Sequence, residues 1–361
     1  MRTKRFMTTA ATVSALALTL AACGGGDDEG DNGGDNGDTG TSEGDGGDAG
    51  GEGDSGEGDG GDAGSAGGEI TIGVHSGWEE GIAVSHLWQA ILEEQGYDVT
   101  LETAEAGVVF TGLAQGDYDL NFDTWLPNTH SDYIEQYGDD LEELGMWYEN
   151  APLTMAVNED APIESLDELA DNADEFGNRI VGIEPGAGLT RITTDEVIPT
   201  YGLEDMEYVI SSTTAMLSEL SAAIDSGDNV VVTLWRPHWA YDAFPIRDLE
   251  DPEGAFGEPD DIYTYGNAEF SSEFPEVAEW IAGFTFSDED LAELENIMFN
   301  EMGGNSNDEA VEQWLADNPD FIDSVVSGGG EAGGETDTEG GESGTEGAGS
   351  ETDSEDAETE S

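Results

Sequence analysis

Two short stretches of this chain place tryptophan, proline and histidine at nearly the same spacing. Residues 119–130 read DLNFDTWLPNTH, and residues 229–239 read NVVVTLWRPHW. In each stretch an apolar, strand-like run reaches a tryptophan, and a proline two residues later ends the run. One such stretch could equally be a core tryptophan followed by a turn. Two of them predict facing walls of one pocket, built by Trp125 and Trp235.

A third tryptophan, Trp78, lies in the segment VHSGWEEG just past the first predicted strand, and so also at a sheet rim. Few cationic side chains lie near any of the three. Indole faces attract a diffuse cation, and a quaternary ammonium group has no N–H that a hydrogen bond could hold. Carboxylate side chains would also attract it, but they would repel the carboxylate of a zwitterion. The three tryptophans therefore predict a cage for a quaternary ammonium ligand.

Other polar residues near these motifs leave alternatives open. His238 could bind a ligand, but its place between a proline and a tryptophan favours a structural role. Arg236 could reach either a ligand or a carboxylate that closes the site. His75 and His86 have no partner motif and are expected in the core or on the surface. Three acidic residues would change the charge of the pocket if they point inward: Glu79, Glu80 and Glu184.

The segments that must position these residues alternate between strand and helix patterns. Strands are expected at 69–74, 97–103, before Trp125, at 152–159, 179–184, 206–211 and in NVVVTLW, with helices between them. Ser165 and Glu168 have the spacing of a capping box. After a proline-rich section at 245–260, the chain to Val326 is expected to be helical. This alternation predicts parallel sheets covered by helices, an α/β fold.

Two sets of alternating elements predict two lobes around a cleft. Their expected limits are about 69–152 with 262–327 for lobe A, and about 153–261 for lobe B. The pocket residues fall on both sides of the connections at 150–158 and 245–265. A ligand in the cleft between the lobes would therefore be contacted by both.

The N-terminal residues predict a lipoprotein signal peptide over 1–22. Arg2, Lys4 and Arg5 precede an apolar run that ends in Leu-Ala-Ala-Cys, which resembles a bacterial lipobox. Cys23 is the only cysteine, so it cannot form an internal disulfide, and lipidation is its simplest use. The apolar run is too short for a membrane span, which needs about 20 residues. The protein is expected to be extracytoplasmic and lipid-anchored to the cell membrane.

The charge is strongly acidic, with 85 Asp and Glu against seven Lys and Arg. Long-range repulsion makes nucleic acid a poor partner. Residues 23–68 and 328–361 are Gly-rich and acidic, which predicts a disordered tether and a disordered tail rather than calcium-binding loops. The 59 acids of residues 69–327 face only four arginines. This imbalance predicts a halophilic origin, because salt screens such repulsion.

Four motifs occur in order along the chain: WLPNTH at 125–130, GIEPGAG at 182–188, SSTTAML at 211–217 and WRPHW at 235–239. Together they closely resemble those of the substrate-binding lipoproteins of glycine betaine/proline betaine ABC importers, the OpuAC/ProX type. The resemblance covers 69–326. It implies a two-lobed periplasmic-binding-protein (venus-flytrap) fold with the ligand in the interlobe cleft. It also implies partners, namely the ABC permease with its ATPase, and no cofactor or metal.

The resemblance also assigns the site residues. It implies that Trp78, Trp125 and Trp235 box the trimethylammonium group. The carboxylate would be held by His130 and by the backbone N–H groups of Gly182 and Ile183, because amides at a strand-to-helix turn suit an anion. Trp78 departs most from the family, since GWEE replaces a W-D-S-E-like stretch.

Other ligands and classes remain as alternatives. A related ligand such as carnitine, choline or a sulfonium analogue could replace the betaine. An anchored hydrolase using His130 or His238 as a base would need a nucleophile, and the chain has neither a G-x-S-x-G elbow nor a usable cysteine. A metal site would need spacing such as HExxH, which is absent from the sequence. We therefore expect a binding protein and not an enzyme.

Overall fold

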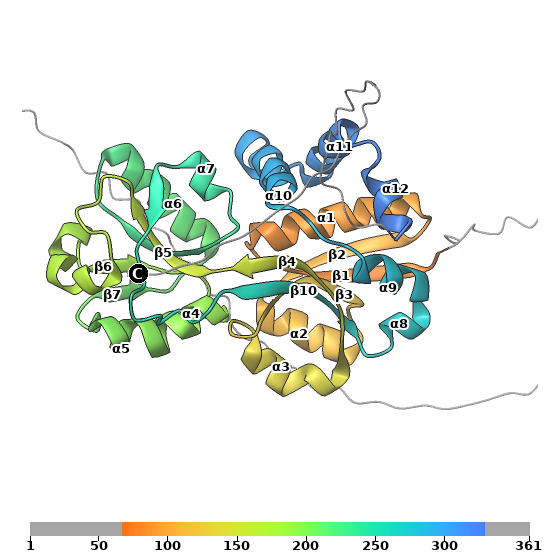
Figure 1. Ribbon diagram of the computed structural model, residues 1–361, viewed down its shortest axis with the longest axis horizontal. Helices are drawn as coiled ribbons and strands as arrows, with labels where there is room; N and C mark the ends of the chain where they lie inside the picture. Colours follow the sequence, from red (N-terminus) through yellow and green to blue (C-terminus); the bar gives the residue numbers. More distant parts are fainter. Residues whose placement is uncertain (1–66, 329–361) are drawn as a thin grey trace, which may run out of the picture. The chain divides into compact units, whose positions relative to one another are not determined.

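Two five-stranded sheets carry the fold in the computed structural model, which describes residues 67–328 (Figure 1). Each sheet with its helices is called a lobe below, the first lobe and the second lobe. The predicted signal peptide, Cys23, almost all of the tether and the tail beyond Gly328 lie outside the described residues. Within residues 67–328, no helix combines the length and the apolar character that a membrane span requires.

The first sheet combines strands from both ends of the described chain, in the order β2-β1-β3-β10-β4. The strands are β1 (Glu69–His75), β2 (Asp98–Ala104), β3 (Leu120–Leu126), β4 (Leu141–Ala151) and β10 (Asp260–Asn267). β1 pairs in parallel with β2 and β3, whereas β10 runs antiparallel between β3 and β4. β10 therefore returns the chain to the first lobe after the second is complete.

The second sheet comes from the middle of the chain, in the order β7-β6-β8-β5-β9. The strands are β5 (Leu153–Asn158), β6 (Arg179–Val181), β7 (Glu207–Val209), β8 (Val231–Trp235) and β9 (Ile246–Asp248). β6 pairs in parallel with β7 and β8, and β5 runs antiparallel to β8 and β9. Only Pro152 separates β4 from β5. The limits proposed for the two lobes themselves stay a prediction.

The prediction of parallel sheets holds for only part of each sheet, because both sheets also contain antiparallel pairs. The expectation of helix from about 260 onward is wrong at β10, and β4 was not predicted. β10 reads DDIYTYGN, in which Ile262 and Thr264 are fully buried between two neighbouring strands. Aromatic and β-branched residues favour a strand once such neighbours exist. The pairing of β10 with distant strands, which its own sequence does not display, decides its structure.

Helices cover the first sheet on both faces, with α1 on one face and α2 and α3 on the other (Figure 1). The α-helices before β9 are α1 (Glu79–Glu94), α2 (Ala106–Gln115), α3 (Ser131–Tyr137), α4 (Gly188–Ile192), α5 (Ile198–Tyr201), α6 (Thr213–Ser226) and α7 (Ala240–Ala243). The C-terminal α-helices are α8 (Phe270–Glu273), α9 (Pro275–Ala282), α10 (Asp288–Glu295), α11 (Asn307–Asp317) and α12 (Phe321–Val326). Short 3-10 segments lie at Gly138–Asp140, Leu166–Glu168 and Ala170–Phe176, and π-helical turns at Thr193–Val197 and Asn296–Glu301.

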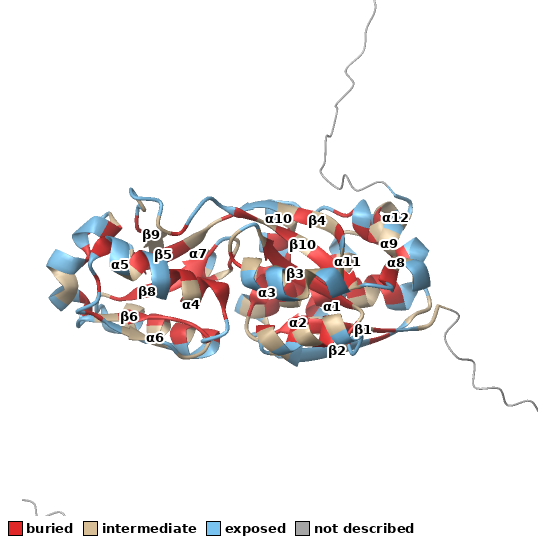
Figure 2. Cartoon of the chain, turned by 90° about the horizontal axis from the view of Figure 1, so that it is seen from below, coloured by how far each residue is buried: buried red, intermediate tan, exposed pale blue. Residues whose placement is uncertain are grey.

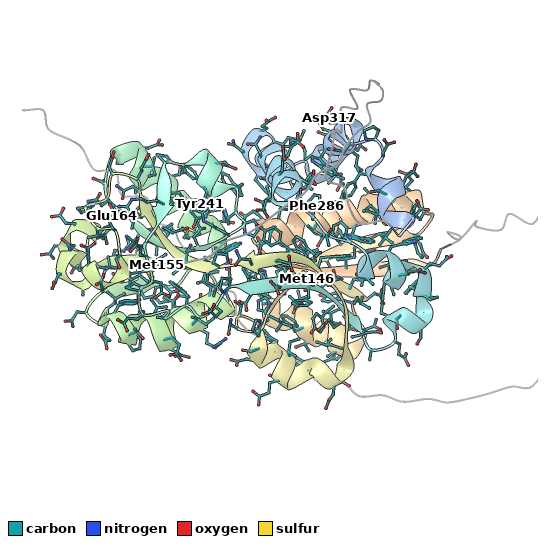
Figure 3. The ribbon with its side chains drawn as sticks, in the orientation of Figure 1. Met146, Met155, Glu164, Tyr241, Phe286 and Asp317 are labelled. Atoms are coloured by element: carbon teal, nitrogen blue, oxygen red, sulfur yellow. The ribbon has the colours of Figure 1, made fainter. Side chains whose placement is uncertain are left out.

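The core follows the apolar faces of these elements. The helical spacing predicted for α1 is confirmed, since the residues on its inner face are fully buried: Val84, Leu87, Trp88, Ile91 and Leu92. Figure 2 shows buried residues on the inner sides of the helices and along the strands. Met155 and Phe286, labelled in Figure 3, are both buried. Phe286 packs edge-on against Trp314 and Phe321 at centroid distances of 5.5 and 5.8 Å, which ties the C-terminal helices to the first lobe.

The capping box predicted at Ser165 is wrong. The Ser165 hydroxyl donates to the carbonyl of Glu250 at 3.3 Å, and the Glu168 carboxylate accepts from the Glu164 amide at 2.8 Å. Ser165 also forms a bridge with Glu250, which lies 85 positions later. Because the Ser165 hydroxyl is bonded to this distant carbonyl, it does not accept the hydrogen bond that a capping box requires. The segment Leu166–Glu168 that follows is a 3-10 turn.

Candidate functional site

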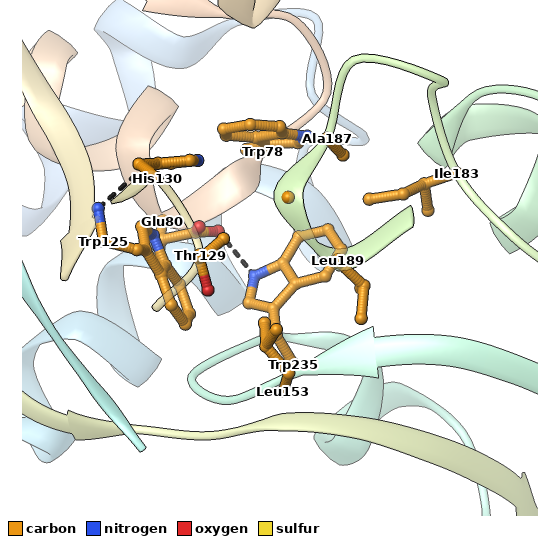
Figure 4. A pocket seen from close by; sticks show the side chains of 11 residues that line it. Trp78, Glu80, Trp125, Thr129, His130, Leu153, Ile183, Ala187, Leu189 and Trp235 are labelled. Carbon is orange, nitrogen blue, oxygen red and sulfur yellow. Dashed lines mark hydrogen bonds between the residues drawn. The ribbon is translucent and has the colours of Figure 1, made fainter. Parts of the chain in front are cut away.

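A pocket with about 280 Å³ of space unoccupied by atoms lies between the ends of the two sheets (Figure 4). Its lining is Trp78, Glu80, Trp125, Thr129, His130, Leu153, Ile183, Ala187, Gly188, Leu189 and Trp235. The first lobe contributes the residues up to His130, and the second lobe contributes the rest. Five of the six predicted site residues are in this lining, and Gly182 is the exception.

The three predicted tryptophans stand on three sides of the space (Figure 4). Each is at least 93% buried. Trp125 is the next-to-last residue of β3, and its indole N–H donates to the Asp123 carboxylate at 2.7 Å. Trp235 ends β8, and its indole N–H donates to the Glu80 carboxylate at 2.9 Å. These bonds fix the two rings, so the pocket keeps aromatic walls when no ligand is present.

His130 is oriented by the loop that Pro127 begins. Its Nδ1 accepts a hydrogen bond from the Trp125 amide at 2.9 Å, and its ring stacks on Trp78 with centroids 5.4 Å apart. A neutral imidazole that accepts at Nδ1 carries its proton on Nε2. Burial, followed by the neighbouring His75 and Arg191, holds the pKa of His130 well below its usual value. His130 is therefore a neutral side chain with a buried N–H donor at Nε2, which has no acceptor among the described residues.

The backbone prediction for the GIEPGAG turn needs a correction. The Gly182 N–H already donates to the Val209 carbonyl at 2.8 Å, so this amide cannot also hold a ligand anion. A side chain at 182 would also collide with Tyr208, whose ring lies 2.5 Å from the ideal Cβ position. Gly182 therefore serves the packing of β6 against β7, while Ile183 lines the pocket.

Sequence reasoning missed several lining residues: Thr129, Leu153, Ala187, Gly188 and Leu189. The glycines of the PGAG sequence could have indicated that the backbone there approaches another part of the chain closely. An added Cβ at Gly188 would lie 2.0 Å from the carbonyl oxygen of Thr129, in the opposite lobe. Only glycine lets α4 approach the first lobe this closely. Gly188 therefore permits the closed arrangement of the pocket.

Contacts across the pocket hold the two lobes together. Arg191 of α4 pairs with Asp132 at 3.1 Å and donates to the carbonyl of Asn128 at 3.1 Å. The Tyr133 hydroxyl donates to the carbonyl of Gly186 at 2.9 Å. The Arg191 and Tyr133 bonds join the segment after β3 to the segment after β6, and the bond from Trp235 to Glu80 joins the end of β8 to the start of α1. The lobes are therefore closed over the pocket.

The remaining candidates lie behind the pocket. The Nδ1 atom of His238 accepts from the Ala240 amide at 3.0 Å, its Nε2 lies 3.3 Å from the Glu79 carboxylate, and its ring packs edge-on against Trp235. Arg236 pairs with Asp248 at 2.8 Å within the second lobe and stacks on Tyr241, so it does not reach across the cleft. His238 therefore supports Trp235, and neither His238 nor Arg236 lines the space. Glu184 likewise binds the amide of Thr213, at 2.8 Å.

The structure places the two other histidines, His75 and His86, in different environments. His75 is buried at the back of the pocket, where its ring lies 4.4 Å from that of Trp78. Burial lowers the pKa of His75 to about 3, so it is neutral at ordinary pH. His86 pairs with Asp308 on α11 and lies outside the pocket lining. No cluster of metal-ligating side chains occurs among residues 67–328.

Residues 68–317 match the family model OpuAC, the substrate-binding domain of the ABC-type glycine betaine transport system. The chain belongs to the OpuAC family. It is therefore a substrate-binding component of an ABC transporter and works outside the cytoplasm as a receptor, not as an enzyme. The α/β fold with two lobes, predicted from the sequence, is confirmed by the structures to which it is similar.

Relatives of this OpuAC-family chain include the Listeria monocytogenes protein named glycine betaine/carnitine transport binding protein GbuC. The two are 30% identical over 164 residues, which are 45% of this chain and 53% of GbuC. The alignment thus spans about half the length of that relative. Lactococcal OpuAC, solved closed with glycine betaine, is 26% identical with a TM-score of 0.66, covering 72% of this chain and 99% of the other. A choline-binding protein of an ABC transporter, solved with choline, is 27% identical with a TM-score of 0.66, covering 73% and 92%.

Proposed function

We propose that this protein captures quaternary ammonium osmolytes of the glycine betaine and proline betaine type, and delivers them to the permease of an ABC importer and its ATPase. The observation that carries the proposal is a closed pocket with Trp78, Trp125 and Trp235 on three sides, contributed by both lobes. A trimethylammonium group offers no hydrogen-bond donor, and indole faces attract its diffuse charge. The match to the glycine betaine family supports the same ligand class.

The carboxylate of the betaine would bind at the opposite end of the pocket. His130 offers its Nε2–H there. Ile183 and the first residues of α4, Gly188 and Leu189, line the same pocket, and the first N–H groups of a helix have no partner within the helix. Neutral donors of this kind bind an anion without adding a positive charge that would repel the ammonium group. We propose these groups as the carboxylate site, in place of the Gly182 amide.

Choline, carnitine or a sulfonium analogue remains the alternative ligand. One observation favours choline in particular, because the Glu80 carboxylate lies in the cage and would attract a ligand with a net positive charge. A hydrolase is not supported, since the family consists of binding components. The test must therefore separate a ligand that has a carboxylate from one that does not.

We expect His130→Ala to weaken glycine betaine binding much more than choline binding, by roughly 10-fold or more for the betaine, because a charge-assisted hydrogen bond contributes about 1.5–3 kcal/mol. Choline has a hydroxyl where betaine has the anion. Isothermal titration of both ligands against the native protein and the variant measures the two losses. His238→Ala is the matched control, since His238 lies behind Trp235 and should affect both ligands equally. Equal losses for the two ligands in His130→Ala would exclude His130 as the carboxylate ligand.

We also propose that Cys23 carries the lipid anchor, as its lipobox predicts. Cys23→Ser expressed with its native leader should then be found in the soluble extracytoplasmic fraction, whereas the native protein should sediment with membranes. Fractionation followed by immunoblotting measures the distribution. If both proteins sediment with membranes to the same extent, the anchor assignment is wrong. Ligand binding by the released variant should be unchanged, because Cys23 lies outside the sequence that matches the family.

A further inference from the structure

One wall of the pocket can change its charge. Of the eleven lining residues, only Glu80 and His130 have ionisable side chains. His130 is neutral, because burial and the nearby His75 and Arg191 hold its pKa well below the usual range. Glu80 is 99% buried beside the aromatic cage and accepts the indole N–H of Trp235. The charge of the cage at a given pH is therefore set by Glu80.

A second carboxyl lies directly behind Glu80. Asp123 of β3 is 99% buried, and its Oδ2 would be 2.4 Å from a Cβ placed on Gly81, the residue after Glu80. Oδ1 accepts the indole N–H of Trp125 at 2.7 Å, while Oδ2 is buried without a hydrogen-bond partner among the described residues. Two tryptophans of the cage are thus bonded to two neighbouring buried carboxyl groups. An unpaired buried carboxylate oxygen is costly, and protonation of the carboxyl group reduces that cost.

The charges that act on Glu80 are negative. Asp123 faces it from β3 and Glu295 faces it from α10, where Glu295 is also 99% buried. Glu79, the preceding residue, lies 3.3 Å from His238 in the second lobe and acts on Glu295, as does Asp242 of α7. His75 and His130, on the other side of Asp123 and Trp125, are neutral. No cationic side chain among residues 67–328 forms an ion pair with the Glu80 carboxyl group. A cation in the cage would therefore supply the only positive charge beside it within the described residues.

We propose that a quaternary ammonium ligand takes the place of a proton held by the buried carboxyl groups of Glu80 and Asp123, so that ligand binding releases about one proton to the solvent. The inference rests on the proposed function, since it places the ammonium group in the tryptophan cage. When the cation enters, its charge stabilises both carboxylates, and the O–H bond of the protonated one breaks. Glu80 is then the anionic wall of the loaded cage and a determinant of its preference for cations.

The direction of the pH dependence follows from the buried pair. Burial raises the pKa of Asp123 to about 7, and burial with the charges of Asp123 and Glu295 raises the pKa of Glu80 well above its usual value. The ligand lowers these pKa values, so below about pH 7 it must displace the proton, and its affinity rises with pH. At pH values where both groups are already ionised, the affinity becomes constant. For one proton the rise is at most about tenfold per pH unit.

The test is calorimetric titration of the full protein with glycine betaine and with choline, at several values between pH 5 and 8. Each titration is repeated in two buffers of different ionisation enthalpy, which counts the protons released. We expect a release of about one proton per ligand near pH 6 that decreases as the pH rises, with both ligands. A count of zero at every pH, with binding intact, would overturn the inference. Absence of binding for both ligands would instead overturn the proposed function.

Two variants locate the proton. Glu80→Gln should reduce both the release and the pH dependence, because glutamine cannot exchange a proton and only the proton of Asp123, whose pKa burial raises, remains. Glu79→Gln is the matched control, since it removes the neighbouring carboxylate that faces His238 and should retain the release. Loss of the release in Glu79→Gln and its undiminished persistence in Glu80→Gln would assign the proton to the Glu79 and His238 pair and contradict the proposal. The count on the native protein tests the inference even if a variant does not fold.

Discussion

Replacing Trp235 by alanine is expected to weaken glycine betaine binding by roughly 10- to 100-fold. Each desolvated cation–π contact contributes about 2 kcal/mol, and about 1.4 kcal/mol corresponds to a factor of ten. Trp235 also donates to Glu80 across the closed pocket, so its loss leaves that carboxylate without a donor. Trp125→Ala should have a similar effect, because Trp125 stands on another side of the cage. Calorimetric titration with glycine betaine measures both losses.

A conservative variant separates the aromatic face from the hydrogen bond. Trp235→Phe keeps a ring but removes the indole N–H, so it should lose much less affinity than Trp235→Ala if the face binds the cation. Trp280→Ala is the matched control, since Trp280 lies on α9, partly buried and outside the pocket lining. Unchanged affinity in Trp235→Ala, with thermal unfolding showing a folded protein, would contradict the aromatic cage.

The folded lobes are expected to depend strongly on salt. Residues 69–327 carry 59 acids and four arginines. Each of these arginines already pairs with a carboxylate: Arg179 with Glu219, Arg191 with Asp132, Arg236 with Asp248 and Arg247 with Glu164. The remaining acids repel one another, and only counterions can screen them. The free energy of unfolding should therefore increase with ionic strength.

Thermal unfolding from about 0.05 to 2 M NaCl measures this dependence. About 1 kcal/mol shifts the midpoint of a domain of this size by roughly 2–4 °C, so a screening gain of several kcal/mol should raise it by roughly 10 °C or more. A sorbitol series of equal osmolality is the control, because sorbitol changes the water activity without screening charge. A midpoint that stays constant or falls with NaCl would remove the argument for a halophilic origin.

Local patterns in the sequence determined much of the site. An apolar run that ends at Trp125 or Trp235 before a proline places the tryptophan at a strand end, because proline cannot continue the ladder. The structure has both residues as the last or next-to-last of a buried strand. Helical spacing in α1 and the βα alternation depend only on neighbouring residues. The α/β class and most of the pocket lining were predictable for this reason.

Contacts between residues far apart in the chain determine the features of the fold and site that local sequence patterns did not predict. β10 is a strand because β3 and β4 stand on either side of it, and its own residues only permit that state. The amide of Gly182 is not available to a ligand carboxylate, because it donates to the carbonyl of Val209, 27 positions later. Glu80 and Glu79 are adjacent and identical in type, yet the helical rotation of α1 directs one into the cage and the other toward His238. Which acid faces the ligand depends on how the lobes close, and only the tertiary structure brings Glu80, Asp123 and Trp235 together.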